Sequence, residues 1–137
     1  MRLLLVHESP LEKIGDRYYA VDPWIRFPMQ LARHCDGMTL LVPVVVRGPE
    51  ESPLPESWRL EDSLQIVHHD FYQTFVQYYS LWLRKAWAWR RRVDDLVREH
   101  DLVVLRHPSP MIGLIGRSAA RCSKPFVILL VGDIAAQ

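Results

Sequence analysis

The stretch that decides the fold is residues 101–133, which read DLVVLRHPSPMIGLIGRSAARCSKPFVILLVGD. Residues 102–105 and 126–131 are apolar throughout, as in strands that are buried on both faces of a sheet. Residues 111–122 lie between them and predict a helix, whose small side chains allow close packing on the sheet. A strand, a helix and a second strand in this order indicate a βαβ unit and therefore parallel strands.

The rest of the chain repeats this alternation. Residues 3–6, 38–46 and 64–68 are further apolar runs, and Pro43 suggests that the second of these strands ends at Val42. Residues 24–35 and 71–100 have apolar side chains at helical spacing, with Pro28 delaying or bending the first helix. Residues 7–23 and 47–61 are expected to be long loops. One face of the longer helix is expected to carry Phe71, Phe75, Tyr79, Trp82, Ala86, Trp89, Val93 and Leu96.

These elements predict an α/β protein. The expected architecture is a Rossmann-like three-layer α/β/α sandwich, with a five-stranded parallel sheet in the order 3-2-1-4-5. A chain of 137 residues is long enough for one domain with a hydrophobic core.

The composition excludes several classes of function. With 17 Lys and Arg against 16 Asp and Glu, the net charge is +1, so we expect no nucleic-acid partner. Cys35 and Cys122 make no disulfide framework, and the apolar run at the N-terminus is too short for a secretory signal. A cytoplasmic location is therefore expected.

The motifs of the common cofactors are missing from the sequence. The segment after the first strand, HESPLEKIGDRYY, has Gly15 as its single glycine and no GxGxxG or Walker A pattern, which argues against NAD, FAD and P-loop nucleotide binding. His68, His69 and Asp70 are adjacent and lack the i, i+4 spacing of metal ligands, and no CxxC or GxSxG occurs. No cofactor and no metal is expected.

A candidate site follows from the expected sheet order. In open parallel sheets, ligands bind beyond the carboxyl ends of the strands, where the strand order reverses. Each polar residue at such a position has an ordinary alternative role, as a solvated strand end. Together, however, they predict one binding cleft, formed by His7, Glu8, Ser9, Arg106, His107, Ser109, Gly132 and Asp133.

The chain resembles the N-terminal domain of GT-B glycosyltransferases, in particular the family-4-like group. The resemblance rests on MRLLLVHE, on WIRFPMQLARHCDGMTLLVPV, and most specifically on residues 101–133, with their Asp-Leu-Val-Val run, helix, Lys-Pro pair, apolar strand and Gly-Asp end. The sequence departs from the family in having Gly15 where many members have a Gly-Gly pair.

The resemblance implies the acceptor side of a sugar transferase. Family members bind the nucleotide-sugar donor in a second Rossmann domain, and the reaction occurs between the domains. We therefore expect residues 1–137 to bind a sugar or lipid-linked acceptor, to meet the donor only through a second domain, and to be inactive alone. Asp133 and His7 are the catalytic candidates. His7 would be the general base if the reaction inverts, but the resemblance favours retaining members, which imply no such base.

A second candidate surface is the segment WLRKAWAWRRR, residues 82–92, which has five basic residues and no acidic one. On a helical wheel, Trp87 falls away from the core face, near Arg91, with Arg84 beyond it. Arg84, Trp87 and Arg91 therefore predict a peripheral contact with an anionic membrane surface, at the inner face of the membrane. The ordinary alternative is a solvated helix face that packs on a loop or another domain.

Two other functions remain open at this point. The chain is alternatively a non-catalytic Rossmann-like binding or interaction module, in which the edge of the fifth strand and the Trp-rich helix pair with a partner chain, so that a homo-oligomer is possible. A flavodoxin-like or receiver-like domain is a third reading. It ranks last because Glu8 has no neighbouring acid that would form a phosphoacceptor pocket.

Overall fold

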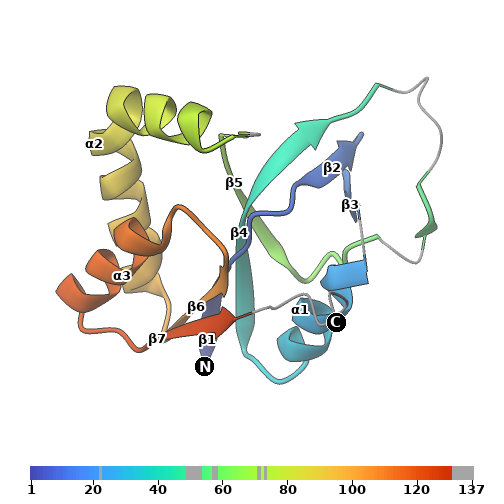
Figure 1. Cartoon of the computed structure of the whole chain (residues 1–137). Coiled ribbons are helices and arrows are strands. Elements are labelled where there is room, and N and C mark those ends of the chain that lie inside the picture. The colour runs from blue at the N-terminus through green and yellow to red at the C-terminus, as the bar shows by residue number, and fades with distance from the viewer. Residues whose placement is uncertain (22, 49–53, 57–58, 71, 73, 131–137) are drawn as a thin grey trace, which may run out of the picture.

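The computed structural model of the chain describes residues 1–21, 23–48, 54–56, 59–70, 72 and 74–130 (Figure 1). These residues form the strands β1 (Arg2–Val6), β2 (Leu11–Ile14), β3 (Arg17–Ala20), β4 (Gly37–Val46), β5 (Gln65–His69), β6 (Leu102–His107) and β7 (Phe126–Leu130). The helices are α1 (Arg26–Ala32), α2 (Phe75–Glu99) and α3 (Ile112–Arg121), and a short 3-10 helix, η1 (Pro23–Ile25), precedes α1. The α/β class expected from the sequence is confirmed.

The centre of the sheet is built from the apolar runs of the sequence. Strand β1 lies between β4 and β6 and is parallel to both, with Leu4 opposite Thr39 on one side and Val103 on the other. Strand β5 adds to β4 and β7 adds to β6, again in parallel. These five strands therefore have the order β5-β4-β1-β6-β7, which is the expected order 3-2-1-4-5.

The prediction of a five-stranded parallel sheet is nevertheless wrong, because the sheet is mixed and has seven strands among the described residues. Strands β2 and β3 form an antiparallel hairpin within residues 7–23, which the sequence analysis treats as a loop. Ile14 pairs with Arg17 across the two-residue turn Gly15-Asp16, and Gly15 has a φ of +58°. Glycine adopts this left-handed conformation at little cost, which suits a tight hairpin turn.

Strand β4 does not end at Val42 but continues through Pro43 to Val46. It pairs with β1 as far as Leu41, whose carbonyl accepts the N–H of His7, and with β2 from Val44 onward. Successive residues of a strand direct their hydrogen-bonding groups to opposite edges of the strand. The backbone nitrogen of Pro43 therefore points to the same edge of β4 as the carbonyl of Leu41, in the gap between β1 and β2. Proline has no N–H to donate and is tolerated there.

Helices cover both faces of the sheet (Figure 1). Alternate residues of β1 enter opposite cores, so that Leu4 and Val6 face α2 and α3, whereas Leu3 and Leu5 face α1 and η1. Gly116 of α3 lies against Phe126 of β7, where an added Cβ would come within 3.3 Å of the ring. The small residues predicted for this helix thus allow its close approach to the sheet.

The expected helices occur with shifted limits. Helix α1 begins only at Arg26, after η1, and ends at Ala32, so Pro28 falls in its first turn, where a missing N–H is harmless. Helix α2 begins after Thr74, whose hydroxyl accepts the N–H of Gln77 at 3.3 Å. Among the side chains that the structure describes, the expected core face of α2 is wrong at Tyr79, which is exposed, whereas its neighbour Tyr78 is buried. Phe71 and the side chain of Phe75, two other predicted core residues, lie outside this described part.

Candidate functional site

The candidate site lies at the carboxyl ends of β1 and β6, next to each other at the centre of the sheet. The chain leaves β1 toward β4 through α1 on one face, and it reaches β6 from β5 through α2 on the other. The strand order therefore reverses between β1 and β6, which is where open α/β sheets bind ligands. His7, Glu8 and Ser9 follow β1, Arg106 and His107 end β6, and Ser109 precedes α3.

His7 is the most buried member of this group, at 3% exposure. Its ring stacks on Trp24 with 3.7 Å between centroids, its Nδ1 accepts the backbone N–H of Ser9 at 2.9 Å, and its Nε2 contacts the guanidinium of Arg106. Burial, together with the positive charge of Arg106, lowers the pKa of His7 to about 3. The ring is therefore neutral at pH 7 and carries a single N–H, so only one of its two nitrogens accepts a hydrogen bond.

Glu8 links the strand ends to the elements that follow β5 and β6. Its carboxylate accepts hydrogen bonds from the hydroxyls of Tyr72 and Ser109. Ser109 is buried, and its oxygen also accepts the N–H of Met111 at 3.1 Å, at the start of α3. Glu8 thus holds together three segments that are far apart in the sequence.

Two tyrosines and a histidine surround this carboxylate. Burial, reinforced by the negative charge of Glu8, raises the pKa of Tyr72 and raises that of Tyr78 to about 12. The two rings meet edge to face at 5.0 Å. Burial also lowers the pKa of His69, against the attraction of Glu8. Both tyrosines are therefore neutral hydrogen-bond donors at physiological pH.

Arg106 is the cation of the site, and its guanidinium has N–H groups available to a ligand. Its side chain is half-buried, and it contacts the uncharged ring of His7. Within the described part of the chain, no carboxylate forms an ion pair with it. A guanidinium with five N–H donors in this setting matches a phosphate or a set of sugar hydroxyls.

The structure brings together His7, Glu8, Ser9, Arg106 and Ser109, which the sequence analysis assigned to one cleft. His107 ends β6 beside them, and its Nδ1 is buried without a hydrogen-bond partner among the described residues. Gly132 and Asp133, predicted members of the same cleft, lie outside the described residues. Their assignment, like the catalytic role of Asp133, stays a prediction.

Sequence reasoning missed two side chains that shape the site, Trp24 and Tyr72. Trp24 reaches His7 from η1, and Tyr72 reaches Glu8 from the segment after β5. Tyr72 could have been found from the sequence, because it follows a third strand whose carboxyl end is at the same edge of the sheet. Trp24 follows no strand end of the parallel set, so no such signal points to it.

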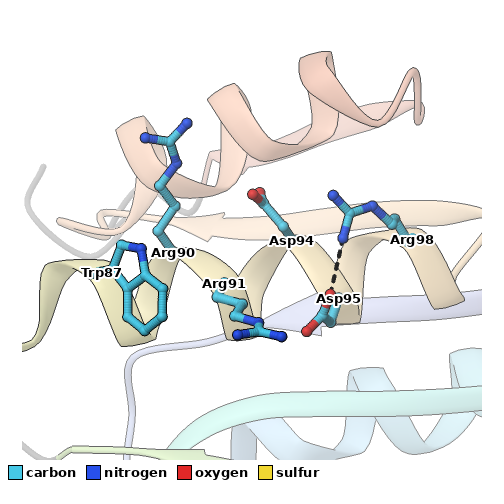
Figure 2. A pocket seen from close by; sticks show the side chains of 6 residues that line it. All are labelled: Trp87, Arg90, Arg91, Asp94, Asp95 and Arg98. Atoms are coloured by element: carbon cyan, nitrogen blue, oxygen red, sulfur yellow. Dashed lines mark hydrogen bonds and ion pairs between the residues drawn. The ribbon is translucent and has the colours of Figure 1, made fainter.

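The residues predicted to contact a membrane, Arg84, Trp87 and Arg91, belong to α2, and Figure 2 shows Trp87 and Arg91 on this helix. Trp87 is 74% exposed, and the guanidinium of Arg91 lies 5.9 Å from the centre of its ring. Arg84 is also exposed. Among the described residues, no helix has the length and apolar character needed to cross a bilayer. The same residues contain no group of three or more potential metal ligands close together.

Comparison with known proteins adds information on the fold alone. No family model matches the chain, and no curated protein matches it. Two solved structures of the C-terminal domain of a hydrogenase from Pyrococcus furiosus are similar to it. One has a TM-score of 0.51 at 13% identity and covers 93% of this chain and 90% of that one. The other has a TM-score of 0.46 at 15% identity, over 94% and 91% of the two chains.

Proposed function

We propose that this chain is the acceptor-binding N-terminal domain of a nucleotide-sugar-dependent glycosyltransferase. In this proposal, its Rossmann-like core binds a sugar or lipid-linked acceptor at the carboxyl ends of β1 and β6. The donor is held by a second domain, and the chain alone is inactive. The observation that carries the proposal is the bonded polar cluster of His7, Glu8, Arg106 and Ser109 at the point where the strand order reverses.

Arg106 is the residue that we assign to the acceptor itself. It is the cation of the cluster, and it is oriented by a neutral, buried ring instead of being neutralised by a carboxylate. A positive charge in this partly dry position attracts an anionic group, such as the phosphate of a lipid-linked or phosphorylated sugar. Glu8 does not compete for this role, because Tyr72 and Ser109 donate to its two carboxylate oxygens.

We assign His7 a positioning role. A general base works best when the pKa of its conjugate acid is near the working pH, and a pKa of about 3 makes His7 a weak base. Its stacking on Trp24 and its contact with Arg106 instead fix the direction of the guanidinium. This assignment agrees with a retaining reaction, in which the acceptor-side domain supplies no base.

The test is a binding experiment on the isotopically labelled chain, followed by amide NMR shifts. The probes are a hexose, a hexose 1-phosphate, inorganic phosphate and UDP-glucose. We expect the hexose 1-phosphate to bind saturably, with shifts at Ser9 and around Arg106. The R106Q variant should weaken this binding at least about tenfold, because a charge-assisted hydrogen bond is lost.

The matched control is R26Q, which removes an exposed arginine at the start of α1 and should leave binding unchanged. The proposal is wrong if none of the carbohydrate probes binds saturably, or if R106Q binds as well as the unaltered chain. It is also wrong if UDP-glucose displaces the hexose 1-phosphate, because that result would assign the donor to this domain.

A second candidate function is an interaction module, and the edge of the sheet favours it. Strand β7 is an edge strand on which Val127, Ile128 and Leu130 are exposed, with Leu130 at 79%. Exposed apolar edge strands add readily to another chain. If this function is right, light scattering should give the molar mass of a dimer, and the I128K variant should give that of a monomer. A monomer at all protein concentrations would exclude self-pairing at this edge.

A further inference from the structure

Helix α2 carries an apolar stripe that the core does not use. Val76, Tyr79, Leu83 and Trp87 follow one another at intervals of three and four residues and are 57% to 79% exposed. At this spacing they lie along one side of the helix. A different side faces the core, where Tyr78, Trp89, Val93 and Val97 are buried. Helix α2 thus has two apolar faces, one that packs on the core and one that is exposed.

The same part of α2 is strongly basic. No Asp or Glu occurs between Asp70 and Asp94, whereas Arg84, Lys85, Arg90, Arg91 and Arg92 lie within this interval. Lys85 pairs with Asp70 at 2.9 Å. Within the described part of the chain, the four arginines form no ion pair. The positive charge beside the stripe is therefore available to an anionic partner.

Two of the acidic residues that follow, Asp94 and Asp95, are paired with other cations. Asp94 accepts hydrogen bonds from Ser118 at 2.5 Å and from Arg121 at 2.6 Å. Asp95 pairs with Arg98 at 2.9 Å, as Figure 2 shows. Although burial opposes it, these hydrogen bonds from Ser118 and Arg121 lower the pKa of Asp94. The acids therefore do little to cancel the charge of Arg90 and Arg91.

Two hollows meet at Trp87 and Arg90. One, of about 520 Å³, lies between α2 and α3 and has an apolar lining of Trp82, Ala86, Trp87 and Leu114, with arginines at positions 90, 117 and 121. The other, of about 480 Å³, continues along α2 past Arg91 to Arg98 (Figure 2). Aromatic and aliphatic groups beside several guanidinium groups match an amphiphile with an anionic head.

From these observations, we propose that the exposed face of α2, together with Arg117 of α3, binds the surface of a membrane that contains anionic lipids. Trp87 and Leu83 enter the boundary between headgroups and acyl chains, and Arg90 and Arg91 contact lipid phosphates. Charge complementarity favours an anionic lipid surface, because a purely apolar partner would leave the arginines without counter-ions. This inference is independent of the sugar acceptor, since it uses none of the residues of the strand-end cluster.

The experiment is co-sedimentation of the chain with large vesicles of phosphatidylcholine alone or with 30% phosphatidylglycerol added. We expect binding to the anionic vesicles at low salt, strong weakening at 0.5 M NaCl, and little binding to phosphatidylcholine. The R90Q/R91Q variant should lose about fivefold in partitioning for each arginine. The W87S variant should lose about tenfold, because the interfacial contact of the ring is removed.

The matched control is R17Q/R26Q, which lowers the net charge by the same amount using exposed arginines of β3 and α1. Circular dichroism checks that each variant is folded. The proposal fails if the chain does not sediment with anionic vesicles at low salt, or if both double variants lose binding equally. It also fails if light scattering shows that W87S dissociates a dimer, because a second copy would then cover this face.

Discussion

The polar cluster at the strand ends and the exposed face of α2 use polar and charged residues in opposite ways. In the cluster, Glu8 and His7 are enclosed, and each is bonded to neighbours from other parts of the chain. On α2, Arg90 and Arg91 are exposed and have no ion pair within the described residues. The enclosed polar groups thus fix the relative positions of strands and loops, whereas Arg90 and Arg91 contribute little to folding and remain available to a partner.

The largest contrast is expected between two tryptophans of α2. Trp89 is buried against Tyr78 in the core, whereas Trp87, two residues earlier, is exposed. The W89A variant should lose about 4 kcal/mol of unfolding free energy because it leaves a large cavity. The W87A variant should change it by less than about 0.5 kcal/mol. Urea denaturation followed by far-UV circular dichroism measures both, and equal losses would mean that Trp87 also supports the core.

Removing Glu8 tests the enclosed cluster directly. The E8A variant leaves the hydroxyls of Tyr72 and Ser109 without their acceptor, and we expect a loss of about 3 kcal/mol in the free energy of unfolding. The control is E61A, which breaks the exposed pair with Arg33 and should cost less than about 0.5 kcal/mol. Similar urea midpoints for the two variants would show that the cluster does not hold the segments together.

The titration of His7 predicts how stability changes with pH. The folded pKa of about 3 lies below the unfolded value of 6.5, so between these values the unfolded chain binds the extra proton. Stability therefore falls as pH decreases below 6.5, and His7 contributes a loss of about 2 kcal/mol between pH 7 and pH 5. The H7F variant keeps a ring against Trp24 but cannot titrate. Its unfolding free energy should depend less steeply on pH, and an unchanged slope would contradict the assignment.

The smallest effect separates the two aspartates of α2. Asp94 accepts from the fully buried Ser118 and from Arg121 of α3, whereas Asp95 pairs with Arg98 on an exposed surface. The D94A variant should lose about 1 kcal/mol more of unfolding free energy than D95A, since the Ser118 hydroxyl keeps no acceptor. Both variants replace an aspartate of α2 by alanine, so the change in helix propensity is the same at the two sites. Thermal denaturation of the two variants measures the difference in stability. Equal midpoints would mean that α3 does not depend on Asp94.

Much of the central sheet could be predicted from the sequence. Continuous apolar runs such as residues 102–105 have no polar face, so they must be covered on both sides, and helices between them force parallel crossovers. The hairpin of β2 and β3 was also encoded locally, because Gly15-Asp16 between LEKI and RYYA is a two-residue turn signal. It was missed because its strands are only four residues long and partly polar.

The candidate site was predictable only in part. Chain direction and strand order determine which strand ends lie at one edge, and this was enough to bring His7, Glu8, Arg106 and Ser109 together. The partners of these residues depend on where loops return to the sheet. Strand order places Tyr72 at the same edge of the sheet as Glu8, 64 residues away, but it does not predict their hydrogen bond. No periodicity shows that Tyr78 and not Tyr79 faces the core.

The sequence by itself determined the α/β class, the order of the five parallel strands and the basic, aromatic character of residues 82–92. These follow from local patterns, because the residue types of a short segment indicate whether a strand is buried on both faces and whether a helix has an apolar side. Only the tertiary structure decided that His7 is neutral against Trp24, that Glu8 accepts from two hydroxyls, and that a hollow beside Trp87 lies between α2 and α3. Those properties depend on desolvation and on contacts between distant segments, which exist only once the chain has folded.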